Sequence, residues 1–292
     1  MQSVISYKDR GNYGNSKYRG NCSGNVIKDL ISQFYPNSKP KKFIEVFSGG
    51  GTGKDVAKEL EIKNSIHLDL NNGWDALIDE IPSGSDFIFS HPPYWNIISY
   101  QKQRGSYNKN DLSNNMSYEE FIKKLNFVNE KIYYSLINGG RHATLIGDIR
   151  KNGKYYSILK DMIWFGELES HIIKIQHNCL SDNKIYNNDS FIAIKHEHIL
   201  VFKKNKIWVF NLKVTETKKD NIMNITNITW RDLIQATIEF FNNKASVDDI
   251  YNILSKSKKA KNNNHVREKI RQTLNENANF YKEQEYWCLK LC

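Results

Sequence analysis

The sequence predicts an α/β fold with a doubly wound, mostly parallel sheet, followed by a small second module. Two observations carry this prediction. Short apolar runs alternate with segments of helical spacing through residues 26–203, which is typical of a parallel sheet wound with helices. Beyond Lys203 the chain becomes rich in Lys and Asn before a new helical pattern begins. We therefore divide the chain into residues 1–221 and 222–292.

The elements of the first domain follow from apolar spacing and from helix breakers. Residues 1–25 are rich in Gly, Asn, Tyr and Ser, and we expect them to form a loop. The expected helices, each ended by Pro or Gly or by loss of the apolar pattern, lie at 26–34, 55–60 and 118–137. The expected strands, each short and apolar, lie at 43–47, 65–69, 86–90, 143–146, 168–175 and 198–203.

The second module has a pattern of its own. The spacing of Thr229 and Asp232 is typical of a cap at a helix start, and residues 246–249 are expected to open a second helix. A third helix is expected at 266–274, before an aromatic strand pair at 280–287. Three short helices followed by a small β-element are typical of a winged-helix domain.

The composition favours a folded protein with a polyanionic partner. Hydrophobic residues make up 39% of the chain, and the formal net charge is +10, which favours nucleic acid first and an anionic membrane second. The four cysteines show no metal-ligand spacing, so we expect neither a metal site nor a disulfide framework. No apolar run approaches the roughly 20 residues of a membrane span. No secretion signal follows Met1, and a cytoplasmic protein without a membrane partner is expected.

A glycine-rich loop follows the expected strand at 43–47. Its pattern, E-x-F-x-G-G-G-T-G at 45–53, would place backbone N–H groups at a helix start, beyond the carboxyl end of a parallel strand, where such sheets bind ligands. The phosphate-binding pattern G-x-x-x-x-G-K-[ST] does not fit, because Ser48 replaces its first glycine and Asp55 replaces its final hydroxyl residue. Taken alone, the loop is equally consistent with a plain tight turn.

Asp69 ends the next expected strand, twenty positions after Gly49 (69 − 49 = 20). An acidic residue at this place can accept hydrogen bonds from the two hydroxyls of a ribose. The pairing with the glycine loop favours a nucleoside-containing cofactor without a pyrophosphate. The alternative is that Asp69 only caps a loop.

The segment Ser90-His91-Pro92-Pro93-Tyr94-Trp95 ends the third expected strand. It resembles the [Asp/Asn/Ser]-Pro-Pro-[Tyr/Phe/Trp] motif of the S-adenosylmethionine-dependent DNA amino-methyltransferases, and Phe47-Ser-Gly49-Gly-Gly51 resembles the cofactor motif of that family. Other segments that resemble the family are Gly20-Asn-Cys-Ser-Gly24, Gly139-Gly-Arg-His, Gly147-Asp-Ile and His196-Glu-His-Ile-Leu-Val-Phe. The resemblance covers residues 11–205 and implies a Rossmann-like, class I methyltransferase domain.

The resemblance also implies a cofactor, a substrate and a set of site residues. The cofactor would be S-adenosylmethionine and the substrate double-stranded DNA, in restriction–modification with a cognate restriction endonuclease, in phage self-protection or in epigenetic marking. The implied catalytic residues are His91, Pro92, Pro93 and Tyr94. The implied cofactor-binding residues are Asn21, Ser23, Glu45, Phe47, Gly49, Gly51, Asp69 and Asp75, with Asp86 as an alternative to Asp75.

The chemistry of an exocyclic amine fits this motif. If the first side chain and the Pro92 carbonyl each accept one N–H, the nitrogen can pyramidalise and direct its lone pair at the methyl donor. Tyr94 would stack on the flipped base. His91 departs from the family, and only a neutral imidazole can accept a hydrogen bond. We therefore expect activity to fall as His91 is protonated, near pH ~6.5 if its pKa is unperturbed.

Several functions stay open at this stage. In the family, Asp and Asn mostly accompany adenine, Ser mostly accompanies cytosine N4, and His accompanies neither, so His91 blurs the choice of base. Adenine N6 is the first choice and cytosine N4 the second. Methylation at cytosine C5 is excluded, because it needs a Pro-Cys pair and no cysteine follows a proline. An RNA or protein methyltransferase and a non-catalytic DNA-binding protein of the same fold are the remaining alternatives.

Basic segments are the candidates for DNA binding. The loop at 99–115 combines cations with amides and aromatic rings, and the segment at 176–188 is a weaker candidate of the same kind. The third helix of a winged-helix domain would lie in the major groove. The predicted DNA-binding residues are Trp95, Lys102, Arg104, Lys258, Lys259, Arg267 and Arg271. Solvated loops, a solvated lysine-rich linker and a core tryptophan are the alternatives.

Overall fold

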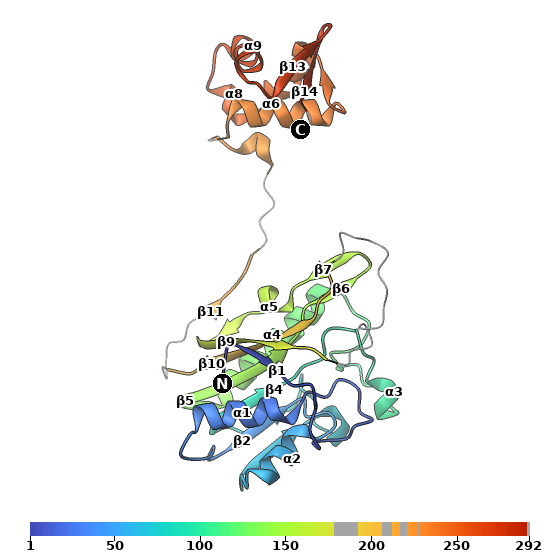
Figure 1. Cartoon of the computed structure of the whole chain (residues 1–292), viewed down its shortest axis with the longest axis vertical. Coiled ribbons are helices and arrows are strands. Elements are labelled where there is room, and N and C mark those ends of the chain that lie inside the picture. The colour runs from blue at the N-terminus through green and yellow to red at the C-terminus, as the bar shows by residue number, and fades with distance from the viewer. Residues whose placement is uncertain (178–191, 206–211, 217–220, 227, 291–292) are drawn as a thin grey trace. The chain divides into compact units, whose positions relative to one another are not determined.

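The computed structural model describes residues 1–177, 192–205, 212–216, 221–226 and 228–290. The chain divides into two compact units, Met1–Glu216 and Thr217–Cys292 (Figure 1). Most of the weaker DNA-binding candidate at 176–188 lies outside the described residues, from 178 onward. None of the helices in the described part is long and apolar enough to cross a membrane.

A seven-stranded sheet forms the centre of the first unit. Its strands, in spatial order, are β1 (Val4–Ser6), β9 (Glu167–Ile175), β10 (His196–Lys203), β5 (Leu136–Ile146), β4 (Ser85–Ser90), β2 (Phe43–Val46) and β3 (Ser65–Leu68). Strand β10 runs antiparallel to both of its neighbours, and the other pairs are parallel. From β2 the chain winds to β3 on one side and then to β4 on the other. The predicted doubly wound α/β class is confirmed.

Alternating side chains of the strands enter two cores, one on each face of the sheet. The helices that cover the sheet are α1 (Gly24–Phe34), α2 (Thr52–Glu59) and α4 (Tyr118–Ser135). Phe43 and Phe87 pack with apolar residues of α1 and α2 on one face. Ile44 and Ile88, the next residues along their strands, pack with residues of α4 on the other. This layering leaves the carboxyl ends of β2, β3 and β4 free to build a site.

Two segments differ from the expectation. Residues 4–6, expected in a loop, form β1, which pairs in parallel with β9 and buries Ile5. Strand β5 begins at Leu136 and runs through Gly139 and Gly140, where a helix stop was expected. Both strands take their hydrogen bonds from partners distant in the chain, so local spacing does not predict them.

Shorter elements surround the sheet. They are η1 (Leu70–Asn72), α3 (Gln101–Arg104), β6 (Ile149–Lys151), β7 (Lys154–Tyr156), α5 (Ile158–Asp161), β8 (Trp164–Phe165) and β11 (Leu212–Lys213). Strand β6 pairs with β7, and β8 pairs with β11. Of this set, η1 and α3 contribute residues to the site described below.

The second unit combines helices with a three-stranded antiparallel sheet. Its elements are η2 (Ile222–Asn224), α6 (Trp230–Phe240), β12 (Lys244–Ala245), α7 (Val247–Leu254), α8 (Lys258–Lys261), α9 (Val266–Glu276), β13 (Phe280–Glu283) and β14 (Tyr286–Leu289). The strand order is β12-β14-β13. Leu233, Ile250, Ile270 and Phe280 meet in one core. The three expected helices and the aromatic strand pair are present, while the lysine-rich α8 was not predicted.

Candidate active site

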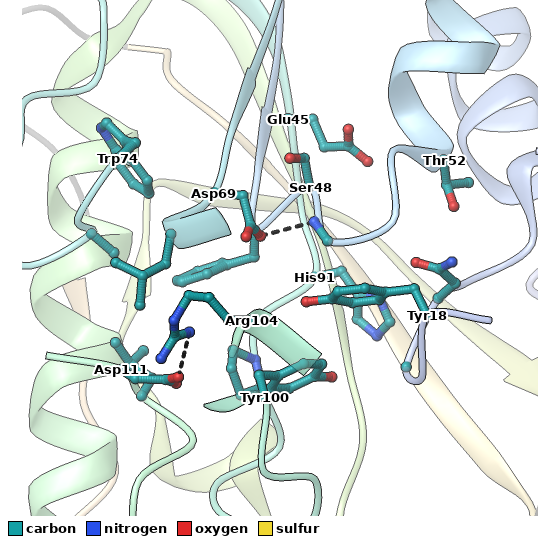
Figure 2. A pocket seen from close by; sticks show the side chains of 18 of the residues that line it. Tyr18, Glu45, Ser48, Thr52, Asp69, Trp74, His91, Tyr100, Arg104 and Asp111 are labelled. Atoms are coloured by element: carbon teal, nitrogen blue, oxygen red, sulfur yellow. Dashed lines mark hydrogen bonds and ion pairs between the residues drawn. The ribbon is translucent and has the colours of Figure 1, made fainter. Parts of the chain in front are cut away.

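A cavity opens at the carboxyl ends of β2, β3 and β4, the edge at which sheets of this kind bind ligands. Side chains from the glycine loop, from the strand ends and from residues 100–111 point into it (Figure 2). The predicted site residues that line the cavity are Asn21, Glu45, Phe47, Gly49, Asp69, Asp75, His91, Pro93 and Arg104. The predicted catalytic and cofactor-binding residues that lie outside its lining are Ser23, Gly51, Pro92 and Tyr94.

Contacts at Gly49 and Gly53 leave no room there for a side chain in the glycine loop. Gly49 has a φ of +49°, and a Cβ on it would lie 2.8 Å from the ring of Tyr18. A Cβ on Gly53 would overlap the carboxyl group of Glu45, whose Oε1 accepts the Gly53 N–H at 2.9 Å. Glu45 Oε2 lies 2.8 Å from Nδ1 of His67 in β3. Glu45 therefore holds the loop in place, and the loop forms a fixed wall of the cavity.

Asn21 and Ser23, both expected near the cofactor, have different roles. Asn21 lines the cavity, accepts the Gly50 N–H at 3.1 Å and donates to the Asn15 carbonyl at 2.7 Å. Ser23 is buried at the N-cap of α1 and accepts the Asn25 N–H at 3.3 Å. A serine before a helix satisfies an N–H that has no partner within the helix. Ser23 is therefore placed to support the helix rather than to contact a ligand.

Asp69 caps the turn η1 and also faces the cavity. Its Oδ2 accepts the N–H of Gly49 and its Oδ1 accepts the N–H of Asn71, each at 2.8 Å. Burial raises the pKa of this carboxyl, although the two N–H groups and Arg104 oppose the shift. Each oxygen keeps a second lone pair, so Asp69 can accept hydrogen bonds from a ligand while it caps the turn.

The structure distinguishes Asp75 from Asp86, which was its alternative as a cofactor-binding residue. Asp75 is buried, lines the cavity and accepts a hydrogen bond from Nδ2 of Asn110 at 2.8 Å. Asp86 lies at the opposite end of β4, where its carboxylate accepts the N–H groups of Lys41 and Lys42, each at 2.8 Å. Only Asp75 shares the cavity with Asp69.

The motif residues follow β4 directly. His91 and Pro93 line the cavity, and His91 Nε2 lies 3.0 Å from the hydroxyl of Tyr94. That hydroxyl donates to Oε1 of Glu197 in β10 at 2.8 Å. Burial lowers the pKa of His91 to about 4, partly opposed by the carboxylate of Glu197. The unperturbed value of ~6.5 therefore does not apply, and His91 is neutral at physiological pH.

Trp95 lies in a hydrophobic core of the first unit, which favours the alternative of a core tryptophan over a DNA-binding role. The side chain is only 8% exposed, and its Nε1 donates to the Met116 carbonyl at 2.8 Å. Its ring lies edge-on against Tyr118 and Tyr156. A bulky side chain in this position can pack in the core or point into solvent. Here the burial of apolar surface in the first unit favours the core.

Arg104, predicted as a DNA-binding residue, faces the cavity rather than solvent. Its Nη1 pairs with Oδ2 of Asp111 at 2.8 Å, and only 8% of its side chain is exposed (Figure 2). Its Nη2 is buried and has no hydrogen-bond partner among the described residues. Lys102, two positions earlier in α3, is exposed. Of these two cations, Arg104 is therefore available to a ligand in the cavity and Lys102 to a partner in solution.

Sequence reasoning missed a pair of stacked tyrosines and a buried ion pair. Tyr18 and Tyr100 line the cavity with ring centroids 5.6 Å apart and an interplanar angle of 21°. Gly20 lies against Tyr100, because a Cβ there would overlap its hydroxyl. Glu197 accepts a hydrogen bond from Nζ of Lys174 at 2.6 Å. The His196-Glu-His segment was noted for its resemblance, but no local pattern links a strand lysine to a motif more than 80 residues away (174 − 91 = 83).

The predicted cations of the second unit differ in their surroundings. Lys258 and Arg271 are exposed and Lys259 is half-buried. Arg267 pairs with Asp248 at 2.8 Å, and its guanidinium lies 4.7 Å from the ring centre of Tyr251. Part of the charge of Arg267 is therefore already balanced within the protein.

Comparison with solved structures gives matches to methyltransferases at low identity. TrmN from Thermus thermophilus matches with a TM-score of 0.38 and 13% identity, over 64% of this chain and 50% of that one. A candidate DNA modification methylase from the same organism, complexed with S-adenosyl-L-methionine, matches with a TM-score of 0.29 and 16% identity, over 69% and 65%. A methyltransferase from Pyrococcus furiosus matches with a TM-score of 0.32 and 16% identity, over 66% and 87%.

This chain thus spans half the length of the TrmN structure and less than two thirds of the methylase. No model of a protein family matches the chain. No curated protein matches it either.

Proposed function

We propose that this chain is an S-adenosylmethionine-dependent methyltransferase that acts on the exocyclic amine of a base in double-stranded DNA, with adenine N6 as the first target and cytosine N4 as the second. One observation carries the proposal: His91 and Pro93 border the same cavity as Gly49 and Asp69. The segment that resembles a catalytic motif and the segment that resembles a cofactor motif therefore face one space.

The cavity fits a nucleoside that carries an amino-acid tail. Asp69 and Asp75 offer buried acceptors for hydroxyl and amino groups. Thr52 and Arg104 line the same cavity, and Thr52 Oγ1 and Arg104 Nη2 are buried without a partner among the described residues. Buried polar atoms in native proteins nearly always have a partner, so this pair supports a polar ligand. When bound, S-adenosylmethionine supplies an electrophilic methyl group at its sulfonium.

The chain's own residues offer two acceptors to a target amine. His91 is neutral at physiological pH, because burial lowers its pKa to about 4, so one ring nitrogen carries a lone pair. The second acceptor is the Pro92 carbonyl that the motif implies, between His91 and Pro93 of the cavity lining. Two acceptors that each hold one N–H would orient the amine and concentrate its lone pair on the opposite side.

The second unit supports DNA as the substrate. Its helix α9 carries Arg267 and Arg271 on exposed positions, and exposed Lys258 lies in the preceding α8. Three helices with a small antiparallel sheet are the parts of a winged-helix domain, which would place α9 in the major groove. The net charge of +10 favours contact with phosphates.

The direct test is to incubate the full chain with unmethylated genomic DNA and S-adenosylmethionine, and to identify modified nucleosides by mass spectrometry. A His91→Ala variant should lose activity and keep cofactor binding. Glu61→Gln is a matched control, because Glu61 lies beyond α2 with a side chain 82% exposed and only Lys39 as its ion-pair partner among the described residues.

The products distinguish the alternatives. N6-methyladenine supports the first target, and N4-methylcytosine keeps the chemistry and changes the base. Cofactor binding without methylation of DNA, RNA or protein would contradict the proposal and favour a non-catalytic DNA-binding protein.

A further inference from the structure

A chain of hydrogen bonds links His91 to two strands on the antiparallel side of the sheet. Nε2 of His91 lies 3.0 Å from the Tyr94 hydroxyl, and this hydroxyl lies 2.8 Å from Oε1 of Glu197. Oε2 of Glu197 lies 2.6 Å from Nζ of Lys174. Glu197 and Lys174 are register partners in β10 and β9. Both are largely buried, so water competes little for these contacts.

Only one placement of the protons on Lys174, Glu197, Tyr94 and His91 makes each of the three contacts a hydrogen bond. The ammonium of Lys174 can only donate. Burial favours the protonated form of Glu197, but the Lys174 ammonium at 2.6 Å and the hydrogen bond from the Tyr94 hydroxyl act against it, and the pKa of Glu197 is lowered, so the carboxylate is ionised and can only accept. The single proton of Tyr94 must therefore point to Glu197. The hydroxyl oxygen is then left as an acceptor, and Nε2 of His91 must carry the proton that it accepts.

We propose that Glu197, acting through Tyr94, is a positioning residue that holds His91 in its Nε2–H tautomer and leaves Nδ1 as the acceptor for an N–H of the target amine. The role of Nδ1 as an acceptor for the amine rests on the proposed function. The hydrogen-bond geometry that sets the tautomer does not. Nδ1 of His91 has no hydrogen-bond partner among the described residues, and His91 lines the cavity. A neutral histidine can take either tautomer, and only this one offers a lone pair at Nδ1.

This chain of contacts from Glu197 through Tyr94 to His91 (the relay) gives Tyr94 a role other than the base stacking that the motif implies. Its hydroxyl is held by His91 and Glu197, and a Cβ on Gly147 would lie 2.6 Å from its ring. A phenol held at its hydroxyl and along its ring can transmit the state of Glu197 to His91 without moving. This restraint explains why a histidine can serve at a position where the family has Asp, Asn or Ser.

Histidine tautomers can be read directly by long-range ¹H–¹⁵N NMR of the full chain labelled at histidine. The chain has only 8 histidines, and the signal of His91 is the one lost in His91→Asn. We expect wild-type His91 to show a protonated Nε2 and an unprotonated Nδ1. The measurement needs neither cofactor nor DNA.

Glu197→Gln should reverse the tautomer. The amide has one acceptor oxygen, and Lys174 requires it because an ammonium cannot accept. The amide NH₂ then faces Tyr94, whose hydroxyl must accept from it and turn its own proton towards Nε2 of His91. The proton of His91 moves to Nδ1, and the acceptor for the amine is lost. We expect kcat to fall about a hundredfold while KM for the cofactor changes less than about twofold.

Removing the ammonium of Lys174 should restore the Nε2–H tautomer of His91. In a Glu197→Gln, Lys174→Met double variant the amide oxygen is free to face Tyr94, so His91 should return to the Nε2–H tautomer and kcat should recover. A merely structural role for Glu197 would predict that the second substitution adds to the damage. Should Glu197→Gln fail to fold, Tyr94→Phe is the substitute, because loss of the hydroxyl should let both tautomers of His91 exchange.

The outcomes separate this inference from the proposed function. A protonated Nδ1 in the wild type, or an unchanged tautomer in Glu197→Gln, would overturn the relay whatever the enzyme methylates. Tautomers that reverse and recover as expected support the relay, and in that case a lack of methylation would count against the proposed function alone.

Discussion

The carboxylate of Asp69 accepts the backbone N–H of Gly49 at 2.8 Å, and this contact joins the ends of two neighbouring parallel strands. The other oxygen of Asp69 accepts the N–H of Asn71 at the same distance. One side chain thus fixes the glycine loop after β2 and the turn after β3 at once. The two walls of the cavity are held in register by a residue that also faces the cavity.

Asp69→Asn should weaken cofactor binding about tenfold or more. The amide has only one acceptor oxygen for two N–H groups and loses the negative charge that favours ribose hydroxyls, at a cost of about 1–3 kcal/mol. Calorimetric titration with S-adenosylmethionine measures the effect. Asp86→Asn is the matched control, because Asp86 also accepts two N–H groups at 2.8 Å but lies outside the cavity. Equal losses of cofactor affinity in both variants would contradict the role of Asp69.

Activity should show no acid limb near pH ~6.5. Burial, with Lys174 adding to it and Glu197 opposing it, lowers the pKa of His91 to about 4. The acceptor lone pair is therefore present at every pH above that value and is lost only as the pH falls through it. Single-turnover rates between about pH 5 and about pH 8 should stay level for this step. A limb near ~6.5 that vanishes in His91→Asn would show that the histidine titrates normally.

The same shift has a consequence for stability. A histidine with a lowered pKa binds its proton more readily in the unfolded chain than in the folded one. Between about pH 6.5 and about pH 4 the unfolded state therefore gains protons that the folded state does not, and stability falls as the pH falls. Buried His142, with a pKa lowered to about 3, acts in the same direction. Urea midpoints measured across this range should decline, and His91→Asn should reduce the slope.

Substitution of Arg104 should affect cofactor binding, and substitution of Lys102 should affect DNA binding. Arg104→Lys keeps a charge for Asp111 but removes the second nitrogen, Nη2, which is buried without a partner among the described residues. Cofactor affinity should fall about tenfold and DNA affinity should hold. Lys102→Ala should do the reverse and reduce the salt dependence of DNA binding by about one unit of slope. Loss of DNA affinity in Arg104→Lys without cofactor present would instead support the predicted role of Arg104 in DNA binding.

Arg271 and Arg267 should contribute unequally to DNA binding. Arg271 is exposed with no ion pair recorded among the described residues, whereas Arg267 pairs with Asp248 and lies over Tyr251. The logarithm of DNA affinity falls linearly with the logarithm of salt concentration, and Arg271→Ala should reduce the steepness of this slope by about one. Arg267→Ala should reduce it less. Fluorescence anisotropy with a labelled duplex at several salt concentrations measures both slopes. Equal slopes in the two variants would show that the Asp248 pair opens on binding.

Local pattern was enough for the main helices and most strands of the sheet, and for the two motifs. Apolar spacing predicted the strands that end at Val46 and Ser90, because burial on both faces of a parallel sheet imposes a short apolar run. The glycine pattern and the Pro-Pro pair are also local, since each restricts the backbone at its own position. The sequence by itself therefore determined the fold class and placed Gly49, Asp69 and His91 at strand ends on one edge of the sheet.

Only the tertiary structure decided which side chains enter the cavity and in what charge state. Arg104 turns inward to Asp111, Trp95 enters the core and Ser23 caps a helix. The neutral state of His91 and its link to Glu197 depend on burial and on a strand more than 100 residues further along the chain (197 − 91 = 106). The physical reason is that desolvation and hydrogen bonding act between neighbours in space, and spacing along the chain does not encode which residues those are.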